Sequence, residues 1–562
     1  VSQKGRSAYQ VLGDALPDFA ASIKFEKSMK WNNSGVSFSR PLRWFVALLG
    51  SVVIPFEYAG VQSGNTSRGL RPFGSPELLI PSAGEYFTII KSSGIILDIQ
   101  ERSDLIAAMV KKAAASLGGS AIIDPGLLAE VTNLVEMPTP IPGSFKEDFL
   151  ALPRDVLIST MKKHQRYFPV ENPAKTGLLP YFIAIRNGDD QHLDIVTHGN
   201  EHVLGARFAD ANFFVREDIK QPLEYYRDGL KTLIFQTKLG SMLDKSARML
   251  TLAGDLSSML GLDEVQALDV RRAAFLAKAD LTTQMVTEMT SLQGIIGREY
   301  ALRSGENPLV SAAIGEQYQP VPASMIGVVI ALSDRIDSLV GLFAAGLVPS
   351  GAKDPFGLRR AAIGTVQPLI EHGLDFDLRT AIQRSAATQP LPVSEEVQAQ
   401  VLEFIVGRLK VVLNDQGYKY DVVDAVLSAR SNNPAAALSA VKQLMAWVSR
   451  PDWASILDAY ARCVRIVRSA GAQRFTVDTA CLDDDAERAL YAAVQKTSAA
   501  SIHSIDDLMN TILPLIPAIT TFFDKVLVMA DDPLVRQNRL GMLQQIASLA
   551  EGQADLAKLE GF

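Results

Sequence analysis

The stretch QALDVRRAAFLAKADLTTQMVTEM, residues 266–289, decides the fold class of most of the chain. Its apolar residues recur at the three- and four-residue spacing of an α-helix, with few signals for strands. The same periodicity is found in residues 222–235 and 240–260 and continues from about Asn212 toward the C-terminal end. We therefore predict that this second part of the protein is almost entirely helical.

Upstream of Asn212, strand-like and helical segments alternate. β-Branched and aromatic residues between glycine, asparagine and proline turns predict strands at 43–50, 51–58, 85–91, 166–170 and 181–188. Helical spacing predicts helices at 104–117 and 152–164. The predicted fold class is multidomain α+β, a mixed α+β N-terminal region followed by mostly α-helical domains. The predicted domains are 1–215, 216–387, 388–450 and 451–562, with loops or linkers at TQPLPVS (388–394) and SNNPAA (431–436).

Composition excludes several classes of protein. With 562 residues, 48% hydrophobic and 21% charged, the chain is typical of a globular protein with several domains. Its longest apolar stretch, near Met325–Leu332, is too short to cross a bilayer, so we expect no membrane association. The formal net charge of −7 leaves room only for local basic surfaces, and the two cysteines have no CxxC spacing that would suggest a zinc site.

The sequence lacks the common motifs that bind nucleotides or metals. It contains no GxxxxGK[ST] loop, no GxGxxG turn, no GxSxG elbow and no HExxH helix. Three of the six histidines cluster in HLDIVTHGNEH, residues 192–202, but Gly199-Asn200 predicts a turn that separates His198 from His202. We interpret them as surface or turn histidines, and we predict no metal site and no catalytic residue in this chain.

One alternative is an HD-type metal-dependent phosphohydrolase, because AFLAKADLTT (274–283) and ALSDRIDSLVG (331–341) have its helical layout. In such enzymes a His-Asp pair and a later aspartate bind the metal. Here the sequence before Asp280 reads Lys278-Ala279, and neither an ammonium nor a methyl group can replace an imidazole ligand. We therefore expect a degenerate scaffold in which Asp280 and Asp334 are helix-surface or capping groups.

A series of long motifs, in one order along the whole chain, resembles the beta subunit of the heterotetrameric bacterial-type glycine–tRNA ligase. In the helical part these motifs are AKADLTTQMVTEMTSLQGIIGREYA (277–301), GEQYQP (315–320), DRIDSLVGLFAAG (334–346), KDPFGLRRAAIG (353–364) and FFDKVLVMADDPLVRQNRLGMLQQI (522–546). Upstream they are SRPLRWFVALLG (39–50), EVTNLVEMPTPIPGSF (130–145), LPRDVLISTMKKHQRYFPV (152–170) and GNEHVLGARFADANFFVREDIK (199–220).

This resemblance implies a division of labour between two parts of an enzyme. The beta part would bind tRNA-Gly, while ATP and Mg²⁺ act in an alpha subunit or alpha region that activates glycine, so no cofactor is expected on this chain. The assembly would be an alpha2-beta2 heterotetramer or a homodimer of fused chains. The start at Val1 without methionine suits the beta portion of a fused plastid or mitochondrial chain, with a bacterial cytoplasmic protein as the alternative.

The resemblance also implies identities for the predicted domains. Residues 1–215 would resemble the editing-type module of the phenylalanine–tRNA ligase beta chain, and residues 216–387 would form the degenerate HD-like domain. Residues 388–450 would be a helical linker region, and residues 451–562 a helical anticodon-binding domain.

Three cationic groups are candidates for tRNA contact, since cations position phosphates and planar or amide groups read unpaired bases. The first is Lys162, Lys163 and Arg166, for which a solvated helix end followed by a core strand is the alternative. The second is Lys353, Arg359 and Arg360, near a helix start that we predict at Asp354-Pro355, with Asp354 as the N-cap. The third lies in the C-terminal block and comprises Arg462, Arg465, Arg536, Asn538 and Arg539.

Within this third group, Arg462, Arg465 and Arg468 recur every three residues and so lie near one helix face. Arg536, Asn538 and Arg539 stand near a second predicted helix start, capped by Asp532 and Pro533. The alternative for Arg536 or Arg539 is an ion pair with DDDAE, residues 483–487.

Overall fold

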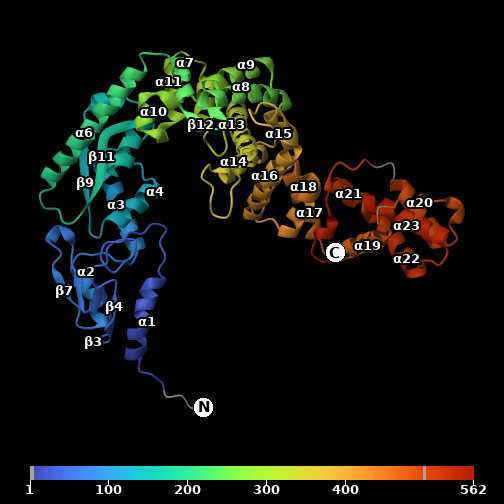
Figure 1. Ribbon diagram of the computed structural model, residues 1–562, viewed down its shortest axis with the longest axis horizontal. Helices are drawn as coiled ribbons and strands as arrows, with labels where there is room; N and C mark the ends of the chain where they lie inside the picture. The colour runs from blue at the N-terminus through green and yellow to red at the C-terminus, as the bar shows by residue number, and fades with distance from the viewer. Residues whose placement is uncertain (1–4, 472, 498–500) are drawn as a thin grey trace. The chain divides into compact units, whose positions relative to one another are not determined.

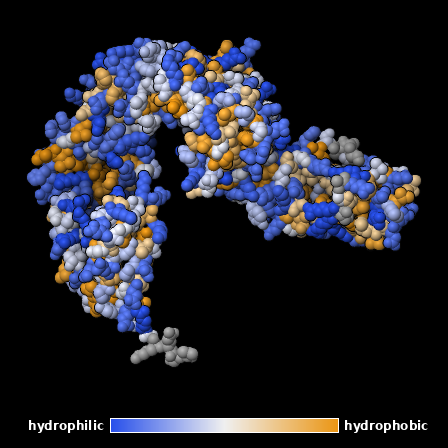
Figure 2. All heavy atoms as spheres, viewed as in Figure 1, coloured by the Kyte–Doolittle hydropathy of each residue, from blue (hydrophilic) through white to orange (hydrophobic). Residues whose placement is uncertain are grey.

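The computed structural model describes residues 5–471, 473–497 and 501–562, which form two compact units, Val1–Glu217 and Asp218–Phe562. The first unit is mixed α and β and the second is almost wholly helical (Figure 1). The predicted multidomain α+β class is thereby confirmed. On the face drawn in Figure 2, hydrophilic and hydrophobic residues are interspersed, as is usual for a folded protein surface.

The first unit is organised round a four-stranded antiparallel sheet with strand order β8-β10-β11-β9. Its strands are β8 (Ser120–Ala121), β9 (Pro138–Ser144), β10 (Phe168–Glu171) and β11 (Leu178–Asn187), and helices α3 (Ile99–Ser116) and α4 (Pro125–Leu134) pack on it. The core between helices and sheet includes Ile106, Val110, Phe168, Val170 and Ile183. The prolines of β9 are tolerated because β9 is an edge strand of this sheet.

Short strands build the region before this sheet. Strand β5 (Val61–Gly64) pairs with β1 (Phe45–Val46) in parallel and with β4 (Glu57–Tyr58) in antiparallel. Two further pairs are β2 (Leu48–Leu49) with β3 (Val52–Val53) and β6 (Thr66–Arg68) with β7 (Glu77–Leu79). Helix α1 (Ala8–Ser22) precedes them.

Two local predictions in this unit were wrong. Residues 85–91, predicted as a strand, form helix α2 (Tyr86–Ser92), because Tyr86 and Ile90, four residues apart, both pack on the Leu70–Ile95 core. The turn predicted at Gly199-Asn200 is absent, since helix α6 (Leu193–Asp218) runs through both residues.

Over the described residues no group of three His, Cys, Asp or Glu side chains is arranged to hold a metal ion. Helices α5 (Arg154–Ser159) and the π-helix Thr160–Gln165 lie where one helix was predicted.

The second unit has α13 (Met325–Ala344) at its centre. This helix is buried on nearly all sides, which its continuous apolar sequence explains, and it contacts α8, α9, α12, α14, α15 and α16. The helices of this region are α7 (Leu223–Tyr226), α8 (Met242–Met259), α9 (Glu264–Leu276), α10 (Gln284–Glu288), α11 (Ile295–Arg303), α12 (Pro308–Glu316), α14 (Leu358–Glu371), α15 (Leu378–Ala386), α16 (Glu395–Asp415), α17 (Tyr420–Arg430) and α18 (Pro434–Val448). A small hairpin, β12 (Ile234–Gln236) with β13 (Gly240–Ser241), precedes α8. No helix of the described ranges is long and apolar enough to cross a membrane.

The last helices form a block of their own, drawn in red in Figure 1: α19 (Trp453–Val467), α20 (Asp485–Thr497), α21 (Ile505–Ile512), α22 (Ile516–Lys525) and α23 (Pro533–Ser548). The C-terminal residues return to α17, where the N–H of Glu560 donates to the buried Asp421 carboxylate at 2.9 Å and the N–H of Asp555 donates to the Ala425 carbonyl at 2.8 Å. These hydrogen bonds join the terminal block to the helices before it.

Candidate functional site

The helical centre of the second unit contains an ion-pair cluster where an HD-type enzyme would bind metal. The Lys278 ammonium donates to Asp334 Oδ2 at 2.8 Å and to the Tyr318 hydroxyl at 3.1 Å. Lys245 on α8 approaches Asp334 Oδ1 at 3.0 Å. Burial alone would raise the pKa of Asp334, but the two ammonium groups lower it well below its usual value. The Asp334 carboxylate is thus occupied by lysines.

The cluster continues one helical turn along α13, at residues that the sequence analysis missed. Asp337 is fully buried and accepts hydrogen bonds from Lys245 at 2.9 Å, from Arg248 Nε at 2.7 Å and from Gln389 at 3.0 Å. Lys245 and Arg248 stand three residues apart on α8, as Asp334 and Asp337 do on α13. Two cations three residues apart in one helix, and two aspartates three residues apart in another, can face each other across the helix contact. This spacing in the sequence could have indicated the buried ion-pair network.

Asp280 lies elsewhere than predicted. It is fully buried and therefore not a helix-surface group, but it has the other predicted role, that of a capping group, because Oδ2 accepts the N–H of Gly294, the N-cap residue of α11, at 2.5 Å. Its Oδ1 has no hydrogen-bond partner among the described residues. Burial raises the pKa of Asp280 to about 6.

The first predicted cationic group is largely paired with acids of the first unit. The Lys162 ammonium lies 2.7 Å from Asp124, and Arg166 Nε donates to Glu130 at 2.9 Å, while Lys163 is exposed. The hydrogen bond from Lys162 holds the pKa of Asp124 below its usual value. The side chain that follows, Tyr167, stacks on Phe182 at 4.6 Å inside the core, as the alternative of a core strand implied.

The second group lies at the start of α14, but the helix begins later than predicted. Gly357, in the left-handed conformation with φ 66°, is the N-cap, so Asp354 and Pro355 precede the helix. Asp354 nevertheless satisfies the first turn, because its carboxylate accepts the N–H groups of Leu358 at 2.8 Å and Arg359 at 2.9 Å. Asp354 thus caps the helix as predicted in function, but from outside the N-cap position.

The cations of this second group have different surroundings. Arg359 donates to the Gly351 carbonyl at 2.5 Å, whereas Lys353 and Arg360 are exposed. Arg360 stands on the wall of a pocket of about 440 Å³, together with Phe356, Gln367 and Asp334. The pocket therefore joins the second cationic group to the ion-pair cluster.

The third group begins on α19, whose inner face buries Ile456, Leu457, Tyr460 and Cys463. Two arginines on its outer face, and a third directly after its end, have guanidinium groups that lie over aromatic rings. Arg462 is 4.6 Å from the Phe523 centroid, and Arg465 and Arg468 are 5.4 and 5.6 Å from that of Phe562. Arg465 and Arg468 are exposed, while Arg462 also lies 3.9 Å from Asp524. A guanidinium that lies on an aromatic ring is held in place by it, and its planar group can still donate hydrogen bonds to phosphates or bases.

The remaining members of the third group lie on α23 and differ in exposure. Asn538 is only 5% exposed, and its amide bonds the backbone N–H of Asp478 at 2.6 Å and the Asp478 carbonyl at 3.1 Å. Arg539 forms an ion pair with the buried Glu487 and donates to the Leu527 carbonyl at 2.8 Å. These two side chains hold the loop before α20 and the loop before α23, and contact of either with RNA stays a prediction. Arg536 is half-buried and donates to the Ala530 carbonyl at 3.2 Å.

Comparisons with known proteins match family models over two successive parts of the chain. A family model described as glycyl-tRNA synthetase beta subunit matches residues 1–428, and one described as DALR anticodon binding domain matches residues 456–556. The chain is 40% identical to a beta subunit of glycine–tRNA ligase from Desulforudis audaxviator and 38% identical to that of Clostridioides difficile, over 99% and 100% of its own length and 82% of each relative. It is also 40% identical, over its whole length, to the chloroplastic/mitochondrial glycine–tRNA ligase 2 of Arabidopsis thaliana, of which it spans 53%.

Proposed function

The chain belongs to the glycyl-tRNA synthetase beta-subunit family, and from this premise we propose that it binds tRNA-Gly for the attachment of glycine by an alpha–beta assembly. The chain spans about half of the plant relative and 82% of the bacterial ones, so the activity of the whole enzyme is part of this proposal. ATP, Mg²⁺ and glycine activation are assigned to the alpha subunit or alpha region, in an alpha2-beta2 heterotetramer or a dimer of fused chains.

The observation that carries the proposal is the outer face of α19. Its inner face is fixed in a helical core, and its exposed Arg465 and Arg468 stand over the ring of Phe562 within the segment that resembles an anticodon-binding domain. A guanidinium placed in this way keeps its hydrogen-bond donors free for phosphates or for the edges of unstacked bases. The exposed Arg360 and Lys353, and Lys163 of the first unit, are proposed to contact the phosphate backbone.

The HD-type phosphohydrolase is not supported by this geometry. An ammonium group occupies the space beside Asp334 that a metal ion would need, and a second ammonium neutralises the same carboxylate. A metal ion would have to displace both ammonium groups from this carboxylate. The ion pairs that fill this space instead hold α8, α13 and the turn at Lys278 together.

The relatives come from two kinds of compartment, so the location of this protein has two candidates. The similarity to a chloroplastic/mitochondrial ligase supports a plastid or mitochondrial protein, and the bacterial relatives support a cytoplasmic one. We favour the organellar assignment.

Salt-dependent binding of tRNA-Gly tests the proposal. Each phosphate that the protein contacts with a cation makes the negative slope of log affinity against log salt steeper by about 0.7–0.9. Loss of such a contact therefore makes the slope flatter. We expect Arg465→Ala with Arg468→Ala to weaken binding roughly tenfold and to flatten that slope. The matched control is Arg474→Ala, an exposed arginine of the same block whose charge is paired with Glu551 at 3.2 Å. Charging of tRNA-Gly by the alpha partner should fall in parallel, and a chain that neither binds tRNA-Gly nor supports charging would refute the proposal.

A further inference from the structure

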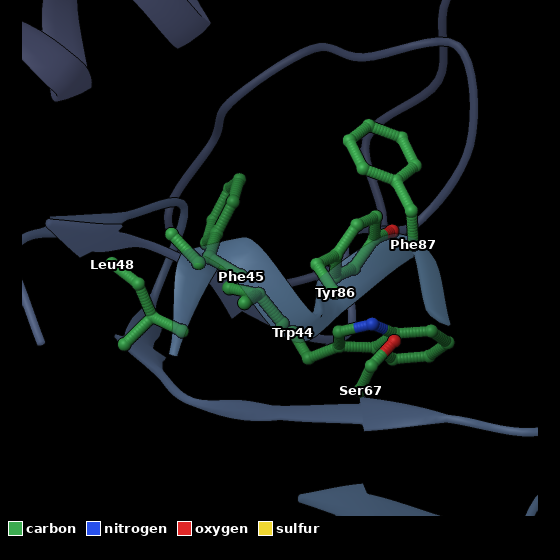
Figure 3. A pocket seen from close by; sticks show the side chains of 8 residues that line it. Trp44, Phe45, Leu48, Ser67, Tyr86 and Phe87 are labelled. Atoms are coloured by element: carbon green, nitrogen blue, oxygen red, sulfur yellow. The ribbon is translucent and has the colours of Figure 1, made fainter. Parts of the chain in front are cut away.

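The first unit contains an aromatic pocket of about 370 Å³. Its lining residues lie between Trp44 and Phe87 in the sequence, whereas the candidate cations begin at Lys162. Trp44 and Phe45 line it from the start of β1, Ser67 lines it from β6, and Tyr86 and Phe87 line it from the first turn of α2 (Figure 3). Its volume is at the lower end of the range of small-molecule sites.

The walls of this aromatic pocket differ in rigidity. Tyr86 packs on the Leu70–Ile95 core, and the ring of Phe45 lies 5.1 Å from that of Phe56, so the inner wall is fixed. Trp44 and Phe87 are 42% and 71% exposed, so their ring faces are accessible from solvent. Accessible aromatic rings beside fixed ones, in one pocket, suit a planar ring that enters from solvent.

The aromatic pocket also contains polar groups without partners. The Ser67 hydroxyl makes no hydrogen bond within the described residues, and although the residue is only 6% exposed, its oxygen keeps contact with solvent through the pocket. In the same part of the chain the indole N–H of Trp44 and the hydroxyl of Tyr86 have no partner either. A ligand that displaces solvent from this hydroxyl costs less free energy if it brings hydrogen-bonding atoms of its own, so the pocket suits a ligand with a polar edge.

We propose that this pocket binds one unpaired nucleobase of an RNA, which stacks on the aromatic walls and bonds to Ser67 through its edge. The inference rests on the proposed function, which supplies the RNA. An apolar side chain of a protein partner fits less well, because it would leave the Ser67 hydroxyl unsatisfied on docking.

The charges near the pocket support stacking as the main source of affinity. Arg43 and Lys91 stand close in sequence to Trp44 and Phe87, but so do Glu85 and, on the adjoining groove that shares Phe87, Asp98 and Glu101. The surroundings therefore have no marked excess of cations. Binding here should depend little on salt, in contrast to the phosphate contacts of the helical unit.

The test uses the full chain and a short labelled oligoadenylate, with a blunt RNA duplex of the same length as the comparison probe. Phe87→Ala should weaken binding of the oligoadenylate about tenfold, because one stacked base is removed, and Ser67→Ala should weaken it severalfold. Both variants should bind the duplex as the unchanged chain does. The control is Phe73→Ala, since Phe73 is also exposed, at 47%, and does not line the pocket.

The outcomes separate this inference from the proposed function. Thermal unfolding checks that Phe87→Ala, a change at a 71% exposed side chain, leaves the fold intact. Equal oligoadenylate affinities for Phe87→Ala and Phe73→Ala, or no binding to the unchanged chain, would overturn the aromatic-pocket proposal, while salt-dependent tRNA-Gly binding through Arg465 would still uphold the function. Loss of binding to the alpha partner with unchanged RNA binding would also overturn it, in favour of a protein contact.

Discussion

The ammonium nitrogen of Lys278 lies 2.8 Å from Oδ2 of Asp334, an ion pair that ties the turn after α9 to the central helix α13. Lys278 is 3% exposed and Asp334 19%, so the pair is shielded from solvent on most sides. A charge in such a place is costly unless it is paired, and here each carboxylate of the cluster has at least two cationic partners. The cluster therefore fixes how three helical segments meet, in the region that carries Arg360.

We predict that Lys278→Met destabilises the helical unit by roughly 3 kcal/mol, because it leaves Asp334, in a mostly buried place, with Lys245 as its only ion-pair partner among the described residues. Urea unfolding followed by circular dichroism measures the change. Lys231→Met is the control, since Lys231 is 63% exposed and pairs with an exposed aspartate. Equal unfolding curves for both variants would show that the Lys278 pair does not stabilise the unit.

Periodicity was sufficient to predict most of the helices, because burial of an apolar stripe is a local property of the sequence. Helix α13 was recognisable as a central helix from MIGVVIALSDRIDSLVGLFA alone. Periodicity failed for residues 85–91, where β-branched and aromatic residues suggest a strand but contacts with Leu70 and Ile95 select a helix. It also failed at Gly199-Asn200, where the long helix α6 absorbs two residues that usually end one.

Residue type alone could not show which cations are available to RNA. Arg465 and Arg539 look equivalent in the sequence, yet Arg465 is exposed and Arg539 pairs with Glu487, 52 residues away. The DDDAE segment did indicate such a pair as one alternative, and the structure selects it. Asn538 gave no comparable signal, because its partners are backbone groups of Asp478 that only the tertiary fold brings near.

Asp280 predicts a specific dependence of stability on pH. Its pKa rises from 3.8 to about 6 on burial, so the folded state holds the proton more tightly than the unfolded state does. The unfolding free energy therefore falls as the pH rises from about 4 to about 6, by about 3 kcal/mol for this group. Asp280→Asn cannot ionise, so its stability relative to the unchanged protein should improve by that amount between pH 4 and pH 7 in urea unfolding.

The control for Asp280→Asn is Asp415→Asn, which removes a carboxylate from an exposed position at the end of α16. Its stability relative to the unchanged protein is expected to stay constant over the same range. A constant difference for Asp280→Asn as well would mean that Asp280 keeps the same proton affinity in the folded and unfolded states.

Substitution of Arg539 should affect mainly the stability of the protein, and substitution of Arg465 mainly its binding of RNA. Arg539→Ala leaves Glu487, which is 1% exposed, without its charged partner, so we expect a loss of roughly 3 kcal/mol from the terminal block. Arg465→Ala removes an exposed side chain and should change stability by less than about 0.5 kcal/mol while weakening tRNA-Gly binding. Thermal unfolding and fluorescence anisotropy with labelled tRNA measure the two effects. An Arg539→Ala protein of normal stability that fails to bind tRNA would instead identify Arg539 as an RNA contact.

Asp354 should control the position of Arg360 through the first turn of α14. Its two carboxylate oxygens accept the N–H groups of Leu358 and Arg359, so Asp354→Ala leaves both donors without a side-chain partner and costs about 1 kcal/mol, as loss of a helix cap usually does. Hydrogen exchange of those two amides should become faster, and tRNA-Gly binding should weaken a fewfold because Arg360 is less well fixed. Asp354→Asn keeps one acceptor oxygen and should give an intermediate result, while Glu371→Ala at the exposed far end of the same helix should leave both amides protected. Unchanged exchange in Asp354→Ala would mean that Gly357 and the helix itself suffice to hold the turn.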